Sequence, residues 1–70
     1  MGDRKFTLRQ WRVIAGLSRE ELADKIGRAP MTIYNWEMGI TQPNAVDIAN
    51  LEDALNINWS QDILLPQRLR

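Results

Sequence analysis

The residues able to do chemistry in this 70-residue chain are few, and their types do not suit catalysis. The sequence contains no cysteine and no histidine, so the usual thiol nucleophile, general base and metal ligand are missing. Two serines, Ser18 and Ser60, and scattered carboxylates do not form a catalytic set. Because a chain of this size buries only one modest core, a deep active-site cleft is also excluded. We expect no enzyme activity, no metal, no cofactor and no small-molecule ligand.

Charged side chains supply most of the remaining polar chemistry, and their signs are unevenly distributed along the chain. Residues 1–28 contain seven basic and four acidic residues, whereas residues 29–62 contain five acidic residues and no lysine or arginine. Arg68 and Arg70 restore a net charge of zero, which argues against a non-specific nucleic-acid coat. The asymmetry predicts one cationic side of the molecule. Ordinary charge scatter in a short chain explains it equally well.

Local capping signals predict an all-α fold of five short helices and no strand. The expected starts are N-cap residues or a proline: Thr7 (with Gln10), Ser18 (with Glu21), Pro30, Asn44 and Asn58 (with Gln61). The expected stops are residues that tolerate a left-handed backbone: Gly16, Gly27, Gly39 and Asn56. The predicted helices therefore cover residues 8–15, 19–26, 30–38, 45–55 and 59–64.

The same signals predict the organisation of the chain. Residues 1–6 are expected to form an N-terminal arm, residues 7–65 a single domain and residues 66–70 a flexible tail. No run of about 18 apolar residues is present, and the first residues lack the apolar stretch of a signal peptide. We therefore expect a cytoplasmic protein.

The second and third predicted helices resemble the helix-turn-helix motif of the XRE family of Cro-like and phage repressors. The resemblance is carried by Leu17-Ser-Arg-Glu-Glu-Leu-Ala-Asp-Lys-Ile-Gly27 and Thr32-Ile-Tyr-Asn-Trp-Glu-Met-Gly39, so that the motif covers about residues 18–38. Ala23 allows close approach of the two helices, Gly27 takes the turn, and Ile33 locks the third helix in place. The similarity extends from Thr7 to about Ile63. It implies a lambda-repressor-like helix-turn-helix domain, whereas the alternative is an unrelated, well-capped helical bundle.

The resemblance also implies which residues touch DNA, because family members insert the third helix into the major groove. The positions that correspond to base-facing residues are Ala29, Pro30, Met31, Thr32, Tyr34 and Asn35. The positions that correspond to phosphate-facing residues are Arg19, Arg28 and Gln42. Asn35 suits adenine, and Met31 and Pro30 suit thymine methyl groups, which predicts a preference for A·T pairs. By the same resemblance, Arg12 and Glu37 are expected to form a partly buried ion pair.

Three positions depart from the family pattern. Arg28 stands where the family usually has an apolar residue, so its side chain is either partly buried or directed at phosphate. Ala29 offers no side-chain oxygen to cap the third helix. The segment 40–42 contains no cation, although this loop is often basic in relatives. These departures predict modest DNA affinity with a shallow salt dependence.

The function that the resemblance implies is sequence-specific binding of double-stranded DNA by a transcriptional regulator. We expect a repressor of phage, prophage or bacterial type that forms a weak dimer, either in solution or only on DNA. The expected dimer surface is the fifth helix, residues 59–64, with the loop before it, where Ile63 and Leu64 are neighbours. The alternative is a protein-interaction module, such as an antitoxin-like or regulatory subunit, that uses the same fold. Its support is the apolar run of residues 63–65 and the neutral net charge.

Overall fold

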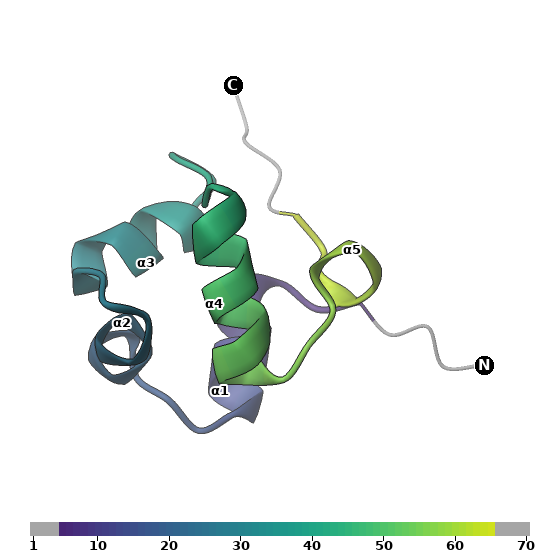
Figure 1. The fold of residues 1–70 in the computed structure, drawn as a ribbon, viewed down its shortest axis with the longest axis horizontal. Helices are drawn as coiled ribbons and strands as arrows, with labels where there is room; N and C mark the ends of the chain where they lie inside the picture. Colours follow the sequence, from purple (N-terminus) through teal and green to yellow (C-terminus); the bar gives the residue numbers. More distant parts are fainter. Residues whose placement is uncertain (1–4, 66–70) are drawn as a thin grey trace.

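The computed structural model describes residues 5–65, which form five helices around one core (Figure 1). The helices are α1 (Leu8–Ile14), α2 (Arg19–Ile26), α3 (Pro30–Glu37), α4 (Ala45–Leu55) and α5 (Trp59–Asp62). The predicted all-α class is confirmed. The expected tail at residues 66–70 and the first four residues of the expected arm lie outside the described residues.

The helix starts follow from local capping. Thr7, Ser18 and Asn44 each accept a hydrogen bond from the backbone amide three residues later. In each case the side chain of that later residue accepts a hydrogen bond from the backbone amide of the cap. At the other ends, Gly27 and Asn56 close α2 and α4 with left-handed φ angles of 71° and 57°. Because these contacts join residues only a few positions apart, they can be predicted from sequence, and α2 and α4 have their predicted bounds.

The fifth helix is shorter than predicted because the chain after it is extended. Ile63 has φ −94° and ψ 130° and forms an isolated parallel bridge with Phe6. The Phe6 amide donates to the Asp62 carbonyl at 3.0 Å, and the Leu64 amide donates to the Phe6 carbonyl at 2.8 Å. The helix therefore stops at Asp62 instead of residue 64. Helices α1 and α3 each end one residue before the predicted position.

The predicted side-chain cap of the fifth helix was wrong. The side chain of Asn58 makes no capping hydrogen bond to the helix, and the amide of Trp59 instead donates to a Glu52 carboxylate oxygen at 2.8 Å. Glu52 lies near the end of α4, so a residue from the preceding helix satisfies the first amide of α5. This contact could not be identified from cap spacing.

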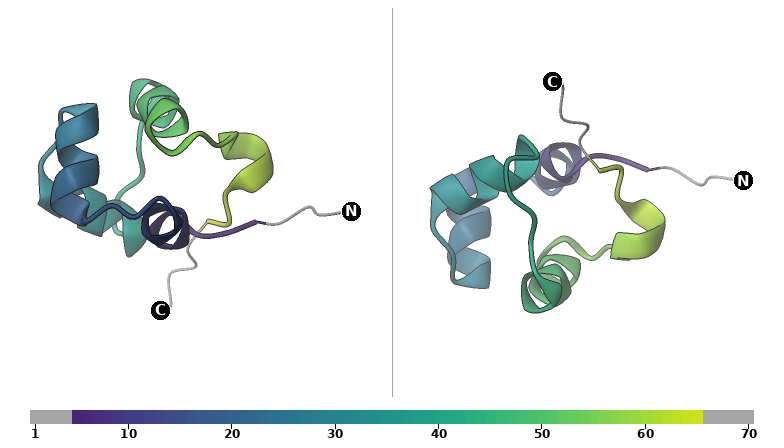
Figure 2. Two further views of the ribbon diagram at one scale, coloured as in Figure 1. Left: turned by 90° about the horizontal axis from the view of Figure 1, so that it is seen from below. Right: turned by 90° about the horizontal axis from the view of Figure 1, so that it is seen from above.

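The core is built where α2, α3 and α4 meet. Leu22, Ile33 and Leu51, one from each of these helices, are fully buried. Helix α2 packs against both α3 and α4, and Figure 2 shows it lying across α1 and α4, which are seen close to end-on. Trp36 is buried as predicted. Helix α3 is therefore anchored through Ile33 and Trp36, which leaves its opposite face exposed.

Candidate nucleic-acid interface

The exposed face of α3 carries no charged side chain. Most of the residues predicted to face bases are exposed: Ala29, Pro30, Met31 and Tyr34. The other two, Thr32 and Asn35, are half-buried. The structure thus brings all six together at the start and along one side of α3, where they offer apolar surface, one hydroxyl from Thr32, one phenol from Tyr34 and one carboxamide from Asn35.

The N-terminus of α3 is left without a side-chain cap. Ala29 is the N-cap residue, with extended backbone angles, and no side chain accepts a hydrogen bond from the first turn. Pro30 occupies the first helical position, where a backbone amide has no acceptor within the helix, so the missing amide proton of proline costs no hydrogen bond. The first turn therefore presents an uncharged surface, from which the Met31 side chain projects with 64% of its surface exposed.

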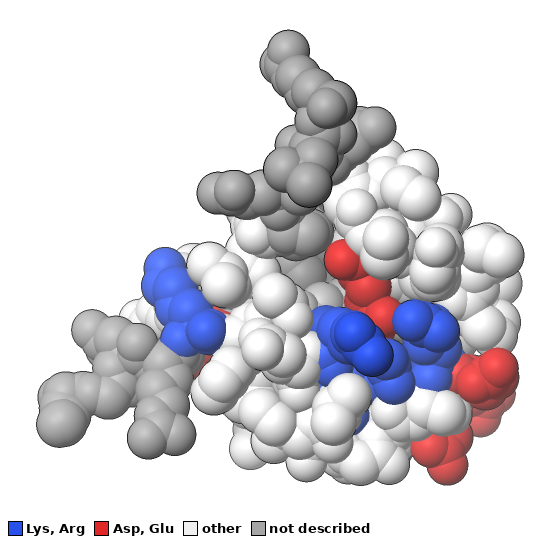
Figure 3. Space-filling model, turned by 180° about the vertical axis from the view of Figure 1, so that it is seen from behind, with Lys and Arg blue, Asp and Glu red and all other residues white. Residues whose placement is uncertain are grey.

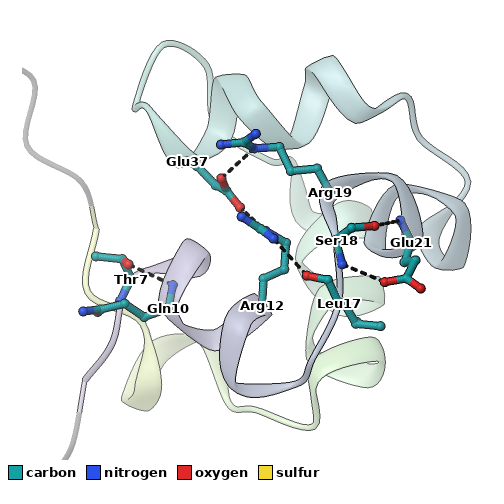
Figure 4. A network of polar contacts seen from close by, with 8 residues as sticks. All are labelled: Thr7, Gln10, Arg12, Leu17, Ser18, Arg19, Glu21 and Glu37. Carbon is teal, nitrogen blue, oxygen red and sulfur yellow. Dashed lines mark hydrogen bonds and ion pairs between the residues drawn. The ribbon is translucent and has the colours of Figure 1, made fainter.

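One buried carboxylate joins α3 to both preceding helices. The Nε atom of Arg12 in α1 donates to Glu37 Oε2 at 2.7 Å, and the Nε atom of Arg19 in α2 donates to Glu37 Oε1 at 3.0 Å (Figure 4). The Glu37 side chain is only 2% exposed. Arg12 also donates from Nη1 to the Leu17 carbonyl at 2.9 Å. The expected Arg12–Glu37 contact is present, and a second arginine that was not expected shares its carboxylate.

Arg19 has a further contact with the exposed face of α3. Its Cζ atom lies 5.2 Å from the centroid of the Tyr34 ring, which is a cation–π distance. The Arg19 side chain is nevertheless 38% exposed. This arginine was assigned a phosphate-facing role from sequence, and the structure places it at the start of α2, beside Tyr34 and Glu37 of α3.

Arg28 lies in the turn between α2 and α3 and is paired with α4. Its Nε and Nη2 atoms donate to the two carboxylate oxygens of Asp47 at 2.8 and 2.9 Å. The hydrogen bond to Asp47, and then the opposite charge, raise the pKa of Arg28 above its ordinary value, so the guanidinium stays charged. The Arg28 side chain is 43% exposed. Arg28 is therefore partly buried against Asp47 while part of its side chain reaches solvent, and its role at a phosphate stays a prediction.

Comparison with protein families assigns the fold to a known class. A helix-turn-helix family model, of the Cro-type XRE family, matches residues 8–61. The chain belongs to the XRE family. A search of curated proteins and a search of solved structures each returned no significant match. This XRE-family chain is accordingly a DNA-binding helix-turn-helix of the transcription-regulator type, a class that is typically non-enzymatic.

The third residue expected at phosphate in this XRE-family domain, Gln42, lies in the loop between α3 and α4. It is exposed, and it borders a small apolar hollow lined also by Trp36, Trp59 and Leu64. Its carboxamide is uncharged, so it can donate a hydrogen bond to a phosphate but cannot release a counterion in the way that a lysine would.

The charge asymmetry of the sequence is partly compensated in the fold. Arg12, Arg19 and Arg28 come from the basic first part of the chain, and all three pair with carboxylates of the acidic second part, Glu37 and Asp47. On the face shown in Figure 3, a group of adjoining basic side chains lies directly beside acidic ones. Among residues 5–65, the basic side chains outside these ion pairs are Lys5, Arg9 and Lys25, so the expected cationic side is only partly neutralised.

Metal-binding groups and membrane-spanning helices are the two remaining features of interest in the described part of the chain. Within residues 5–65, no three acidic side chains are grouped so that they could hold a metal ion. No helix there is long and apolar enough to cross a membrane.

Sequence reasoning missed Asp47, the buried carboxylate that holds Arg28. Its position three residues after Asn44 is the spacing of a capping box, and both capping hydrogen bonds are present. That spacing could have predicted the capping role of Asp47, and an arginine in a position that is usually apolar could have predicted an ion pair there. The spacing could not identify Asp47 as the partner of Arg28, because the two residues are 19 positions apart in sequence.

Proposed function

We propose that this chain is a repressor of phage, prophage or bacterial type that binds an operator with α3 in the major groove. The observation that carries the proposal is the uncharged, exposed face of α3 with Arg19 beside Tyr34 and with Arg28 in the turn before the helix, both arginine side chains being more than a third exposed. Phosphates border each side of the groove, so a neutral reading surface beside the net positive charge of Arg12, Arg19 and Glu37 suits this ligand. Repression follows because an occupied operator is closed to other proteins.

The composition of the face suits A·T base pairs. A carboxamide such as that of Asn35 can pair with the N6 and N7 atoms of adenine, and Met31 and Pro30 can pack against thymine methyl groups. Thr32 adds a hydroxyl that donates to or accepts from either a base or a phosphate. Ala29, the N-cap residue, has a small side chain and adds little bulk at the start of α3.

We also propose that two copies bind adjacent half-sites as a weak dimer that assembles on DNA. Such half-sites lie about one helical turn apart in this class of protein. The surface expected from sequence needs correction, because Ile63 is only 7% exposed and packs in the core through its extended conformation. Leu64 and Leu65 are 50% and 55% exposed and take its place as the apolar contact residues.

The experiment that tests this function is selection of bound duplexes from a random library, followed by titration of the selected duplex and of a scrambled one. We expect a preference of at least about 1000-fold at physiological salt, with A·T pairs in the centre of each half-site. A chain that binds no duplex in preference to another would contradict operator binding. The protein-interaction alternative, in which exposed apolar residues such as Leu64 grip a partner, would then account for the fold.

A further inference from the structure

We propose that Glu37 and Tyr34 are positioning residues that hold the Arg19 guanidinium so that its terminal amino groups face a DNA phosphate. This inference rests on the proposed operator binding. It assigns Tyr34, expected from sequence to face bases, to a different task. It also gives the buried Glu37 a role in DNA binding beyond its pairing with Arg12.

The first argument is the way in which Arg19 is held. Glu37 accepts a hydrogen bond from Nε only, at 3.0 Å, and the Tyr34 ring lies against the guanidinium with its centroid 5.2 Å from Cζ. Among residues 5–65 neither terminal nitrogen of Arg19 has a hydrogen-bond partner. The plane of the group is thus fixed at one edge and one face, while the four N–H bonds that fit a phosphate remain free.

The second argument is charge. Arg12 and Arg19 share the single carboxylate of Glu37, so this cluster keeps one unit of positive charge. Arg28 and Asp47 form a one-to-one pair with no net charge. Arg19 and Arg28 therefore differ in kind, because only the cluster that contains Arg19 has a net positive charge with which to attract a nearby phosphate.

The third argument concerns order. A free arginine side chain loses rotamer entropy when it docks on a phosphate, by an amount near the top of the range for side chains. Glu37 is 2% exposed and fixed by Arg12, so its carboxylate is a rigid anchor for Arg19. Tyr34 closes the other side. The docking cost is therefore largely met during folding, before DNA arrives.

The test measures binding of a random-sequence duplex of about 20 base pairs as a function of salt, with the full chain, four variants of the cluster and one control variant. We expect Arg19→Ala to lower the salt slope by about one unit. We expect Tyr34→Leu to weaken binding about 2- to 5-fold, the range that an exposed cation–π contact supports. In the Arg19→Ala background the same Tyr34→Leu change should have no further effect. Tyr34→Phe, which keeps the ring, should bind like the parent.

The matched control is Arg9→Ala, which removes an exposed arginine of α1 outside the cluster and should leave the salt slope nearly unchanged. Circular dichroism and the melting temperature of each variant show that it is folded. If Tyr34→Leu weakens binding equally with and without Arg19, Tyr34 contacts DNA independently and the positioning role is wrong.

The experiments distinguish failure of operator binding from failure of the positioning role. If the parent chain selects an operator but Arg19→Ala leaves the salt slope unchanged, operator binding stands and the positioning role fails. If the parent binds no DNA, both fail. NMR of the Arg19 Nε–H group adds a readout without DNA: a sharp, slowly exchanging signal that broadens in Tyr34→Leu and persists in Tyr34→Phe is expected. A signal that is broad in the parent would contradict the fixed geometry.

Discussion

Arg28 and Asp47 form a two-point ion pair that ties the turn of the helix-turn-helix to the first turn of α4. Arg28 donates through Nε and Nη2 to the two oxygens of Asp47, and Asp47 also accepts a hydrogen bond from the backbone amide of Asn44. Asp47 is 4% exposed as a residue. One carboxylate therefore closes the capping box of α4 and fixes the turn before α3, so that the position of α3 depends on it.

Replacing this carboxylate should destabilise the fold more than replacing its partner. Asp47→Ala removes the acceptor for Arg28 and for Asn44, and we expect the free energy of unfolding to fall by about 2 kcal/mol, in the range for hydrogen bonds to a charged group. Arg28→Ala should cost less, because Asp47 keeps its capping contacts. Urea denaturation of both variants measures the difference, and equal losses would contradict the double role of Asp47.

The buried Glu37 carboxylate should contribute strongly to stability. Glu37→Ala leaves Arg12, whose side chain is 10% exposed, without its anion, and we expect a loss of about 3 kcal/mol. A double-mutant cycle with Arg12→Ala separates the pair from the rest of the network, in which Arg12 also donates to the Leu17 carbonyl. Additive losses in that cycle would mean that the two side chains are not energetically coupled.

Asn35 should be responsible for sequence preference without affecting general affinity. If its carboxamide reads an adenine, Asn35→Ala should lose about 1–3 kcal/mol on the selected operator and bind random DNA nearly as before. Competition titrations with the two duplexes measure both effects in one experiment. Equal weakening on the two duplexes would instead place Asn35 at the backbone of the DNA or in the structure of α3.

The two arginines near α3 should respond differently to salt. Arg28 is neutralised by Asp47, so Arg28→Ala should lower the salt slope by clearly less than the unit expected for Arg19→Ala. Titrations of a random duplex over a range of salt concentrations give both slopes. A full-unit loss for Arg28→Ala would show that Arg28 leaves Asp47 for a phosphate on binding.

Dimerisation on DNA should depend on the exposed leucines after α5. Leu64→Asp and Leu65→Asp each place a charge on an apolar surface that is already half exposed, so the monomer should keep its melting temperature while cooperative binding to a two-half-site operator is lost. Sedimentation of the complex gives the number of chains bound. Two chains on the operator in both variants would exclude this surface as the contact.

The sequence by itself determined where the helices begin, the side-chain caps of α1, α2 and α4, and the side of α3 that faces inward. Thr7, Ser18 and Asn44 act on amides three residues away, and Gly27 needs only its own backbone freedom, so each signal is complete within one turn. Ile33 and Trp36 share a face because of helical periodicity alone. The family motif added the Arg12–Glu37 pair, which local spacing does not reveal.

The tertiary structure alone decided which charges meet and where the last helix ends. Arg19 and Glu37 are 18 residues apart in sequence, and the bridge that ends α5 joins Phe6 to Ile63. Contacts of this kind depend on how the helices cross, and the sequence offers several carboxylates that each arginine could have met. Local signals set the elements because their partners are neighbours in the chain, whereas the pairing of distant groups is settled only when the core brings their helices together.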